Sequence, residues 1–128
     1  MRGYRNEAAF SKAFCTMLKH KHWFVQRIES GETGKGIPDI YSISPSGIPV
    51  WFELKREHLI VYPNTVLTVH WRPGQQAWLH EVTKYKQRAY TIMATDNVYL
   101  AVQHDRLYKD NRITMNDCDV FTSLGDIV

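Results

Sequence analysis

Apolar residues recur along the chain in a helical period at two places, and these places predict two helices. The first is expected over residues 6–22, where Asn6 is suited to cap the start. Its apolar stripe consists of Phe10, Phe14, Met17 and Leu18. The second is expected over residues 73–88, because Pro73 suits a first helical turn and an apolar stripe follows it.

The remaining apolar segments predict strands, because they are short, rich in β-branched and aromatic residues, and bounded by turn residues. They cover residues 23–29, 37–44, 50–55, 90–95 and 98–103. Pro45-Ser46-Gly47 and Asp96-Asn97 predict the turns of two hairpins.

Two segments fit this pattern less well. The apolar stretch 59–71, interrupted by Pro63-Asn64, is expected to form an extra hairpin on the core. A dimer surface and an arm that wedges DNA are the alternatives for it. Residues 104–128 are polar and predict no defined element.

Composition limits the class of protein. With 128 residues, 44% hydrophobic and 12% aromatic, the chain is expected to form one small α/β or α+β domain rather than a disordered segment. No apolar run approaches the length of about 18 residues that a membrane span needs, and no secretory signal opens the sequence. Two cysteines favour a reducing environment, so a cytoplasmic protein is expected, in the host cytoplasm if a phage encodes it.

The net charge of +3 is concentrated at the start, where residues 1–27 hold six basic residues and one acid. This excess is compatible with a polyanionic partner but too small to establish one. The sequence contains no P-loop or dinucleotide fingerprint, so no nucleotide cofactor is expected. The six histidines lack zinc-ligand spacing, and no serine-hydrolase motif is present.

Three acids and one lysine stand at unusual positions. Glu7 falls within the apolar stripe of the first helix, and Asp39 starts a strand after a glycine-rich loop. Glu53 and Lys55 share one face of an otherwise hydrophobic strand. Ordinary structural roles are the alternatives: a first-turn acid favoured by the helix dipole, a turn-capping Asp, and a cross-strand charge pair.

Together these residues suit phosphodiester chemistry. Asp39 and Glu53 are expected to bind a Mg²⁺ ion through carboxylate oxygens, with the backbone carbonyl of Leu54 as another ligand. Glu7 would bind the metal too or hold a water. Lys55 would stabilise the charge that develops on the phosphate or orient the attacking water, which the metal activates.

The spacing of these residues resembles that of a known nuclease superfamily. Pro38-Asp39, thirteen further residues and Glu53-Leu54-Lys55 reproduce the PD-(D/E)XK motif, and the α-β-β-β-α-β order matches that superfamily's core. The segment 25–39 is most similar to archaeal Holliday junction resolvases. The segment 72–79 is similar to a phrase of the VRR-NUC nucleases and includes their glutamine as Gln75, although Arg72 replaces their usual serine.

This resemblance implies a restriction-endonuclease-like α/β fold, with a central mixed sheet flanked by helices, in a single nuclease domain with a core at about residues 6–103 and a polar extension at 104–128. It implies an Mg²⁺-dependent DNA endonuclease, with Mn²⁺ able to substitute, that acts on branched DNA as a homodimer. Glu7, Asp39, Glu53, Lys55 and Gln75 would be its catalytic residues. The residues expected to contact DNA are Arg27, Ser30, Lys35 and Arg72.

Two alternatives remain. One is a nuclease of the same superfamily that cuts linear, flap or single-stranded DNA, as a nicking or restriction-type enzyme would. The other is a non-catalytic DNA-binding or inhibitory protein on the same fold.

Overall fold

The computed structural model describes residues 3–28, 36–108 and 110–128. Its elements begin in chain order with α1 (Glu7–His20), β1 (Phe24–Arg27), β2 (Ile40–Ile43), β3 (Pro49–Arg56), β4 (Val66–Thr68) and α2 (Gln75–Thr83). They continue with β5 (Arg88–Ala94), β6 (Tyr99–Gln103), β7 (Arg112–Thr114), the 3-10 helix η1 (Met115–Asp117), β8 (Asp119–Phe121) and the 3-10 helix η2 (Leu124–Asp126). The predicted order α-β-β-β-α-β is therefore present, with the short β4 inserted before α2.

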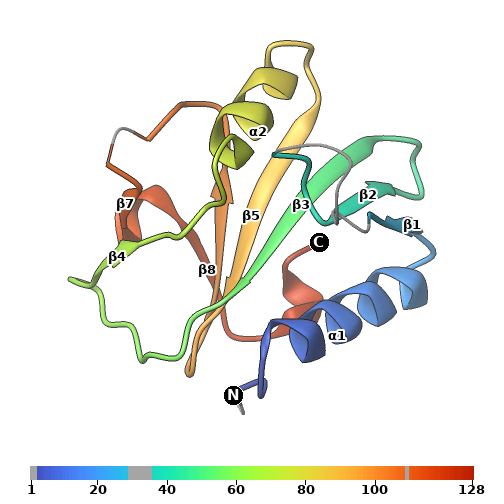
Figure 1. The fold of residues 1–128 in the computed structure, drawn as a ribbon. Helices are drawn as coiled ribbons and strands as arrows, with labels where there is room; N and C mark the ends of the chain where they lie inside the picture. Colours follow the sequence, from blue (N-terminus) through green and yellow to red (C-terminus); the bar gives the residue numbers. More distant parts are fainter. Residues whose placement is uncertain (1–2, 29–35, 109) are drawn as a thin grey trace.

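The centre of the molecule is a mixed sheet in the order β1-β2-β3-β5-β6-β8 (Figure 1). The strands β3 and β5 run parallel, and the other neighbouring strands run antiparallel. The predicted hairpins are confirmed: β2 and β3 join through a turn in which the Gly47 amide donates to the Ser44 carbonyl (2.8 Å), and β5 pairs with β6. The mixed sheet predicted from the sequence is confirmed.

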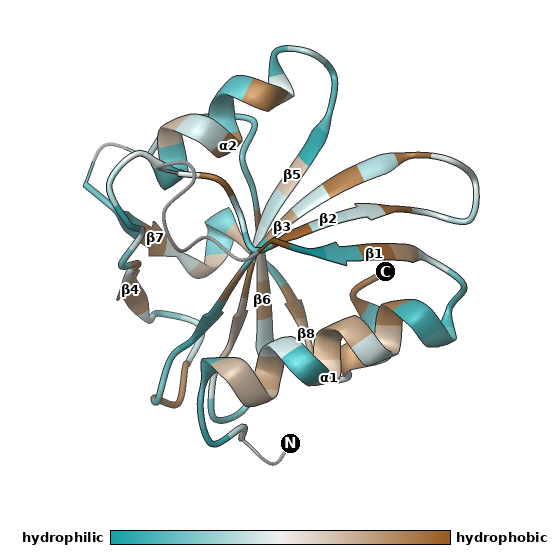
Figure 2. Ribbon diagram, turned by 45° about the vertical axis from the view of Figure 1, so that its right-hand side comes forward, coloured by the Kyte–Doolittle hydropathy of each residue, from teal (hydrophilic) through white to brown (hydrophobic). Residues whose placement is uncertain are grey.

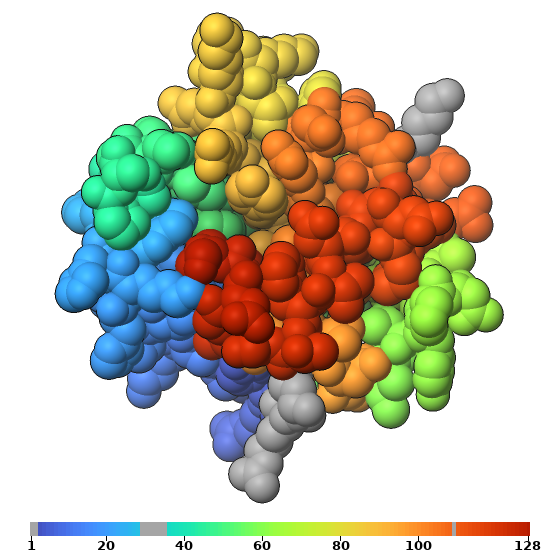
Figure 3. All heavy atoms as spheres, turned by 180° about the vertical axis from the view of Figure 1, so that it is seen from behind, coloured from blue at the N-terminus to red at the C-terminus, as the bar shows by residue number. Residues whose placement is uncertain are grey.

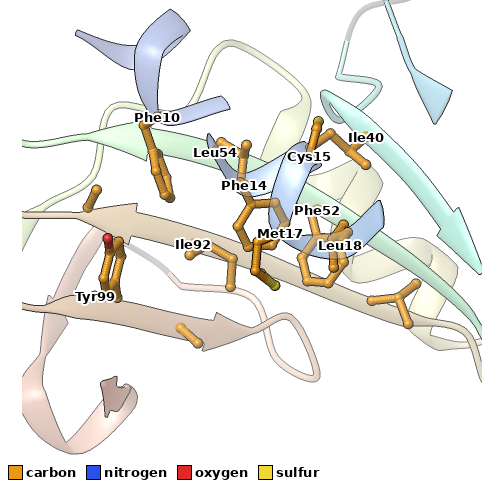
Figure 4. Close-up of a cluster of buried hydrophobic side chains, with 13 residues drawn as sticks. Phe10, Phe14, Cys15, Met17, Leu18, Ile40, Phe52, Leu54, Ile92 and Tyr99 are labelled. Atoms are coloured by element: carbon orange, nitrogen blue, oxygen red, sulfur yellow. The ribbon is translucent and has the colours of Figure 1, made fainter. Parts of the chain in front are cut away.

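The helix α1 covers one face of the sheet and packs through aromatic side chains (Figure 4). The side chain of Phe14 is fully buried, and its ring meets Phe52 of β3 edge-on at a centroid distance of 5.0 Å. Phe10 packs against Phe14 at 6.0 Å. Complete burial of each such side chain contributes roughly 1.5–3 kcal/mol, so this packing fixes where the first turn of α1 lies.

Side chains alternate across β3, and this alternation separates core from chemistry. Phe52 and Leu54 point into the core beneath α1. Glu53 and Lys55 point to the opposite face, where Lys55 meets Gln75 of α2. Figure 2 shows the two helices apart, on either side of the strands.

The predicted hairpin over residues 59–71 is wrong. Residues 59–62 form no strand, and β4 pairs instead with β7, in the register Leu67 to Ile113. Both of these side chains are buried in a second hydrophobic cluster. The backbone of Val61 is held by the side chain of Asn97, which accepts from its N–H (3.0 Å) and donates to its carbonyl (2.8 Å). Burial of Ile113 therefore favours a long-range pairing over a local hairpin.

Residues 104–128, for which the sequence predicts no element, complete both sheets. In addition to β7, they supply β8, which pairs with β6 at the edge of the main sheet. Lys21 anchors this segment to the end of α1, because its Nζ donates to the carbonyls of Gly125 and, at 2.6 Å, of Val128. Figure 3 shows these C-terminal residues, in red, across the middle of the face opposite to that of Figure 1.

Both helices are shorter than predicted, because left-handed residues follow them. The helix α1 ends at His20, and His22 has a φ of 66°. The helix α2 spans Gln75–Thr83 rather than 73–88, and Lys86 at φ 62° turns the chain into β5. Among the described residues, no helix has the length and apolarity to cross a membrane.

Candidate active site

Glu7, the first residue of α1, brings one carboxylate to the edge of the sheet. Asn6 caps the helix as predicted, its side chain accepting from the Ala9 amide at 2.8 Å. The residue Glu7 as a whole is exposed, but burial of its carboxyl group raises its pKa. The charge of Lys55 opposes this shift, and that of Asp39 adds to it.

The carboxylates of Asp39 and Glu53 each accept a hydrogen bond from a backbone amide of the opposite segment. The Asp39 amide donates to Oε1 of Glu53 at 3.2 Å, and the Leu54 amide donates to Oδ2 of Asp39 at 3.1 Å. Asp39 immediately precedes β2, where the chain leaves the pairing with β3, so its side chain is free to turn toward the neighbouring strand. These reciprocal bonds fix two carboxylates at one end of the β2–β3 pair.

The carboxylates of Glu7, Asp39 and Glu53 converge, since an oxygen atom of each lies within 4.8 Å of an oxygen of the others. Glu53 is the most enclosed, with 1% of its surface exposed. Burial raises the pKa of Glu53 to about 7, and the charge of Asp39 adds to this shift while Lys55 opposes it. Three acids so close together repel one another, and a cation between them would relieve that repulsion.

Lys55 lies beside this cluster with its amine almost buried. Its Nζ is 3.2 Å from Oε2 of Glu53 and donates to Oε1 of Gln75 at 3.3 Å. Gln75, the first residue of α2, is fully buried, and its Oε1 also accepts from the Arg72 amide at 2.9 Å. Among the described residues, its Nε2 has no hydrogen-bond partner. The predicted lysine and glutamine are therefore brought together with the acids.

The donor set fits a hard divalent cation. Carboxylate oxygens are the ligands that Mg²⁺ prefers, and the three acids offer them at one point. The Leu54 amide points to the β2 side of β3, and the N–H and C=O of one strand residue share a side. The carbonyl predicted as a ligand therefore lies on the same side of the strand as Asp39.

The residues predicted to contact DNA lie farther apart than the acids, Lys55 and Gln75 do. Arg72 lies at the cluster, with Nη2 at 3.9 Å from Oδ1 of Asp39 and about half of its side chain exposed. Arg27 is exposed at the end of β1, opposite Ile40. Ser30 and Lys35 lie outside the described residues.

One contact that supports the site was not predicted from the sequence. Gly36, at φ 89°, lies against the backbone of Gly74 and Gln75, and an added Cβ would be 2.5 Å from the Gly74 carbonyl oxygen. Gly74 is itself left-handed, with φ 84°, and caps α2. The only signal in the sequence was a pair of glycines in separate turns, which does not show that the turns touch.

Comparison with known proteins adds one decisive likeness. No family profile and no curated protein sequence matches the chain. Seven chains of solved structures match it. One is Hjc of Archaeoglobus fulgidus, a Holliday junction resolvase from an archaeal hyperthermophile, with a TM-score of 0.60 and 14% sequence identity over 84% of this chain and 87% of that one. The chain has the restriction-endonuclease-like fold.

This likeness confirms the fold that the PD-(D/E)XK motif predicted. At 14% identity it shows the fold alone, so the roles of individual residues rest on the geometry of this chain. Within the restriction-endonuclease-like fold, the acids, the lysine and the glutamine come from α1, the β2–β3 pair and α2. These are the elements that the sequence assigned to them.

Proposed function

We propose that the protein is a metal-dependent DNA endonuclease that hydrolyses phosphodiester bonds in branched DNA, in the manner of a Holliday junction resolvase. The observation that carries the proposal is the convergence of Glu7, Asp39 and Glu53 beside Lys55. The likeness to Hjc, a Holliday junction resolvase, supports the choice of substrate. Three acids that converge around the buried Glu53 destabilise a folded chain when no cation is bound, which favours a binding role over a structural one.

Asp39 and Glu53 would hold a Mg²⁺ ion, for which Mn²⁺ would substitute, with Glu7 and the Leu54 carbonyl as further ligands. When bound, the cation would neutralise charge on the scissile phosphate and lower the pKa of a water molecule. The reciprocal bonds between Asp39, Glu53 and the two strands keep the carboxylates oriented before the substrate arrives.

Lys55 would bind the phosphate group directly. Its Nζ lies beside the cluster, 3.2 Å from Oε2 of Glu53, where it would donate to a phosphate oxygen as negative charge develops there. Gln75 keeps the amine in place through its Oε1. Arg72 and Arg27 would contact neighbouring phosphates, together with Ser30 and Lys35.

Two copies of the chain would act together on a four-way junction. Resolution needs two symmetric cuts, and a chain with one site supplies one of them. A symmetric homodimer is therefore part of the proposal. Light scattering of the purified protein, alone and with a junction, would measure the stoichiometry.

A cleavage assay tests the proposal. The wild-type protein would be incubated with Mg²⁺ or Mn²⁺ and a labelled four-way junction, flap, single strand or linear duplex. Symmetric nicking of the junction is expected, and Glu53→Gln should lose it because the amide oxygen is a weaker ligand. Glu81→Gln is the matched control, since Glu81 is an exposed acid of α2 that pairs with Lys84 at 3.0 Å.

The other outcomes separate the alternatives. Cutting of linear, flap or single-stranded DNA, with the junction left intact, would keep the chemistry and overturn the substrate. No cutting at all, with tight DNA binding and no rise in Tm on addition of Mg²⁺, would indicate a binding protein.

A further inference from the structure

Two consecutive glutamines at the start of α2 point in different directions, and both are buried. Gln75 is directed to Lys55 at 3.3 Å. Gln76 is directed away from the acids, and its Nε2 donates to Oδ1 of Asn111 at 2.9 Å. Its Oε1 accepts from the Tyr108 amide. The first turn of α2 thus joins the lysine to the segment that follows β6.

The chain just before α2 is held by the same C-terminal segment. The Trp71 indole N–H donates to Oγ1 of Thr91 at 3.0 Å, and the Trp71 ring stacks on Tyr108 at a centroid distance of 6.2 Å. His104 lies 2.7 Å from the same hydroxyl and is fully buried. Burial lowers the pKa of His104 to about 4, so the imidazole is neutral at pH 7. Both ends of the segment 72–75 therefore rest on Tyr108 and Asn111.

Asn111 contacts the chain on both sides of residues 70–75. Its carbonyl accepts from the Val69 amide at 2.8 Å, and its side chain accepts from Gln76. Its φ of 54° is left-handed, a conformation that asparagine tolerates better than most residues. The next residue, Arg112, begins β7, whose pairing with β4 fixes the position of the backbone.

We infer that Gln76 and Asn111 are positioning residues, which brace the start of α2 so that Gln75 holds Lys55 against the acids. The inference rests on the proposed nuclease function, because the position of Lys55 affects the rate of DNA cleavage. It assigns residues 104–108 and 110–114 to the support of the active site, beyond their part in the core. A displacement of about 1 Å at a reacting group costs up to roughly 100-fold in rate.

The test uses variants that keep the left-handed backbone at position 111. Asn111→Gly removes the side-chain acceptor, whereas Asn111→Asp retains an acceptor oxygen for Gln76. With each protein in excess over a labelled four-way junction, Asn111→Gly should lower the single-turnover rate about tenfold, equivalent to about 1.4 kcal/mol, relative to the wild type and leave junction affinity unchanged. Asn111→Asp should restore the rate. His22→Gly, at another left-handed residue that follows α1, is the matched control.

Hydrogen exchange supplies a readout that does not depend on cutting. The amides of Gln75 and Trp78, which donate to Arg72 (3.0 Å) and Gly74 (2.9 Å), report on the first turn of α2. Asn111→Gly should speed their exchange, while the amides of β3 stay protected. If Asn111→Gly fails to fold, Gln76→Glu serves instead, because it removes the donor to Asn111 and keeps the acceptor for Tyr108.

Three results would overturn the inference. They are a wild-type rate in Asn111→Gly, an equal loss in Asn111→Asp and Asn111→Gly, and faster exchange spread evenly over the whole sheet. If the wild-type protein cuts no DNA, the proposed function fails. Hydrogen exchange at the first turn of α2 in Asn111→Gly then still decides whether Gln76 and Asn111 stabilise the start of α2.

Discussion

Glu53 shows how much one side chain depends on its surroundings. A carboxylate with 1% exposure is unfavourable in a protein interior unless it is paired and hydrogen-bonded. Here Lys55 supplies the charge and the Asp39 amide supplies the hydrogen bond. These contacts do not cancel the cost of burial, since the pKa of Glu53 rises to about 7.

The first prediction concerns pH and the free energy of unfolding without metal. Between about pH 5 and pH 7, the folded chain keeps a proton on Glu53 that the unfolded chain has released. Unfolding then releases a proton, so the contribution of Glu53 to stability should fall as pH rises through this window and be constant above it. Urea unfolding in EDTA at several pH values, for wild type and Glu53→Gln, measures it.

The comparison is made on the difference between the two proteins. Glu7, whose pKa burial also raises, is present in both and cancels. The stability of the wild type relative to Glu53→Gln should therefore fall from pH 5 to pH 7. A difference that stays flat or rises over that range would contradict the raised pKa.

The second prediction concerns Lys55. Lys55→Ala should abolish cutting, a loss of at least about 100-fold in rate, because the charge that stabilises the phosphate is gone. Junction binding should persist, since it draws on other basic residues. A nuclease assay and a binding titration with the same junction measure the two effects. Lys12→Ala, at an exposed lysine of α1, should leave both unchanged, and a wild-type rate for Lys55→Ala would exclude the assigned role.

At the scale of elements, the local sequence pattern was sufficient to predict a helix or hairpin whose capping or turn residues lie within the element itself. Asn6 and the apolar stripe located α1 because a capped amphipathic helix is specified by neighbours in sequence. The β2–β3 hairpin followed from Gly47 in the same way. The pairing of β4 with β7 could not be predicted, because it joins Leu67 to Ile113 across 46 positions and neither segment is distinctive alone.

The candidate site was predictable for a related reason. The motif places Asp39 just before β2 and Glu53 and Lys55 within β3, so the pairing of these two strands brings them together. Glu7 needed the helical period as well, and Gln75 came from the resemblance of segment 72–79 to the VRR-NUC nucleases. The contact of Gln76 with Asn111 could not be predicted from the sequence, since nothing in the polar segment that contains Asn111 indicates where it packs.

The third prediction concerns the junction between Gly36 and α2. Gly36→Ala should cost the strain of a left-handed alanine, about 1 kcal/mol, and about 1–3 kcal/mol more for the clash with the Gly74 carbonyl. Gly47→Ala is the matched control, because Gly47 has nearly the same φ, 88°, and nothing within 4 Å of an added Cβ. Urea unfolding gives both values, and equal losses would mean that the close approach is not real. Only Gly36→Ala should also slow cutting.

At the scale of the whole molecule, the chain closes on itself. Its last residues lie against its first helix, since Lys21 binds the carbonyl of Val128 and Leu124 packs on the core beneath α1. The strand β8 pairs with β6, and β7 pairs with β4. The C-terminal strands therefore belong to the same folding unit as the sheets they complete.

The fourth prediction follows from that closure. A chain truncated after Gln103 should fail to unfold cooperatively, because it lacks β8 and the buried side chains of Tyr108 and Ile113. Circular dichroism during thermal unfolding measures this. Val120→Thr, on the exposed side of β8, is the control and should change Tm little. A truncated chain that keeps a sharp transition near the wild-type Tm would show that residues 6–103 fold alone.

The contact between Gln76 and Asn111 can form only late in the synthesis of the chain. Glu7, Asp39, Glu53 and Lys55 all precede Asn111 by at least 56 positions, which is about 3–11 seconds of translation at roughly 5–20 residues per second. A nascent chain thus carries the acids and the lysine well before it carries the segment that positions the lysine. On the proposed function, full cutting activity would be acquired at a late stage of translation, so a fragment that ends within that interval would cut DNA more slowly than the complete chain.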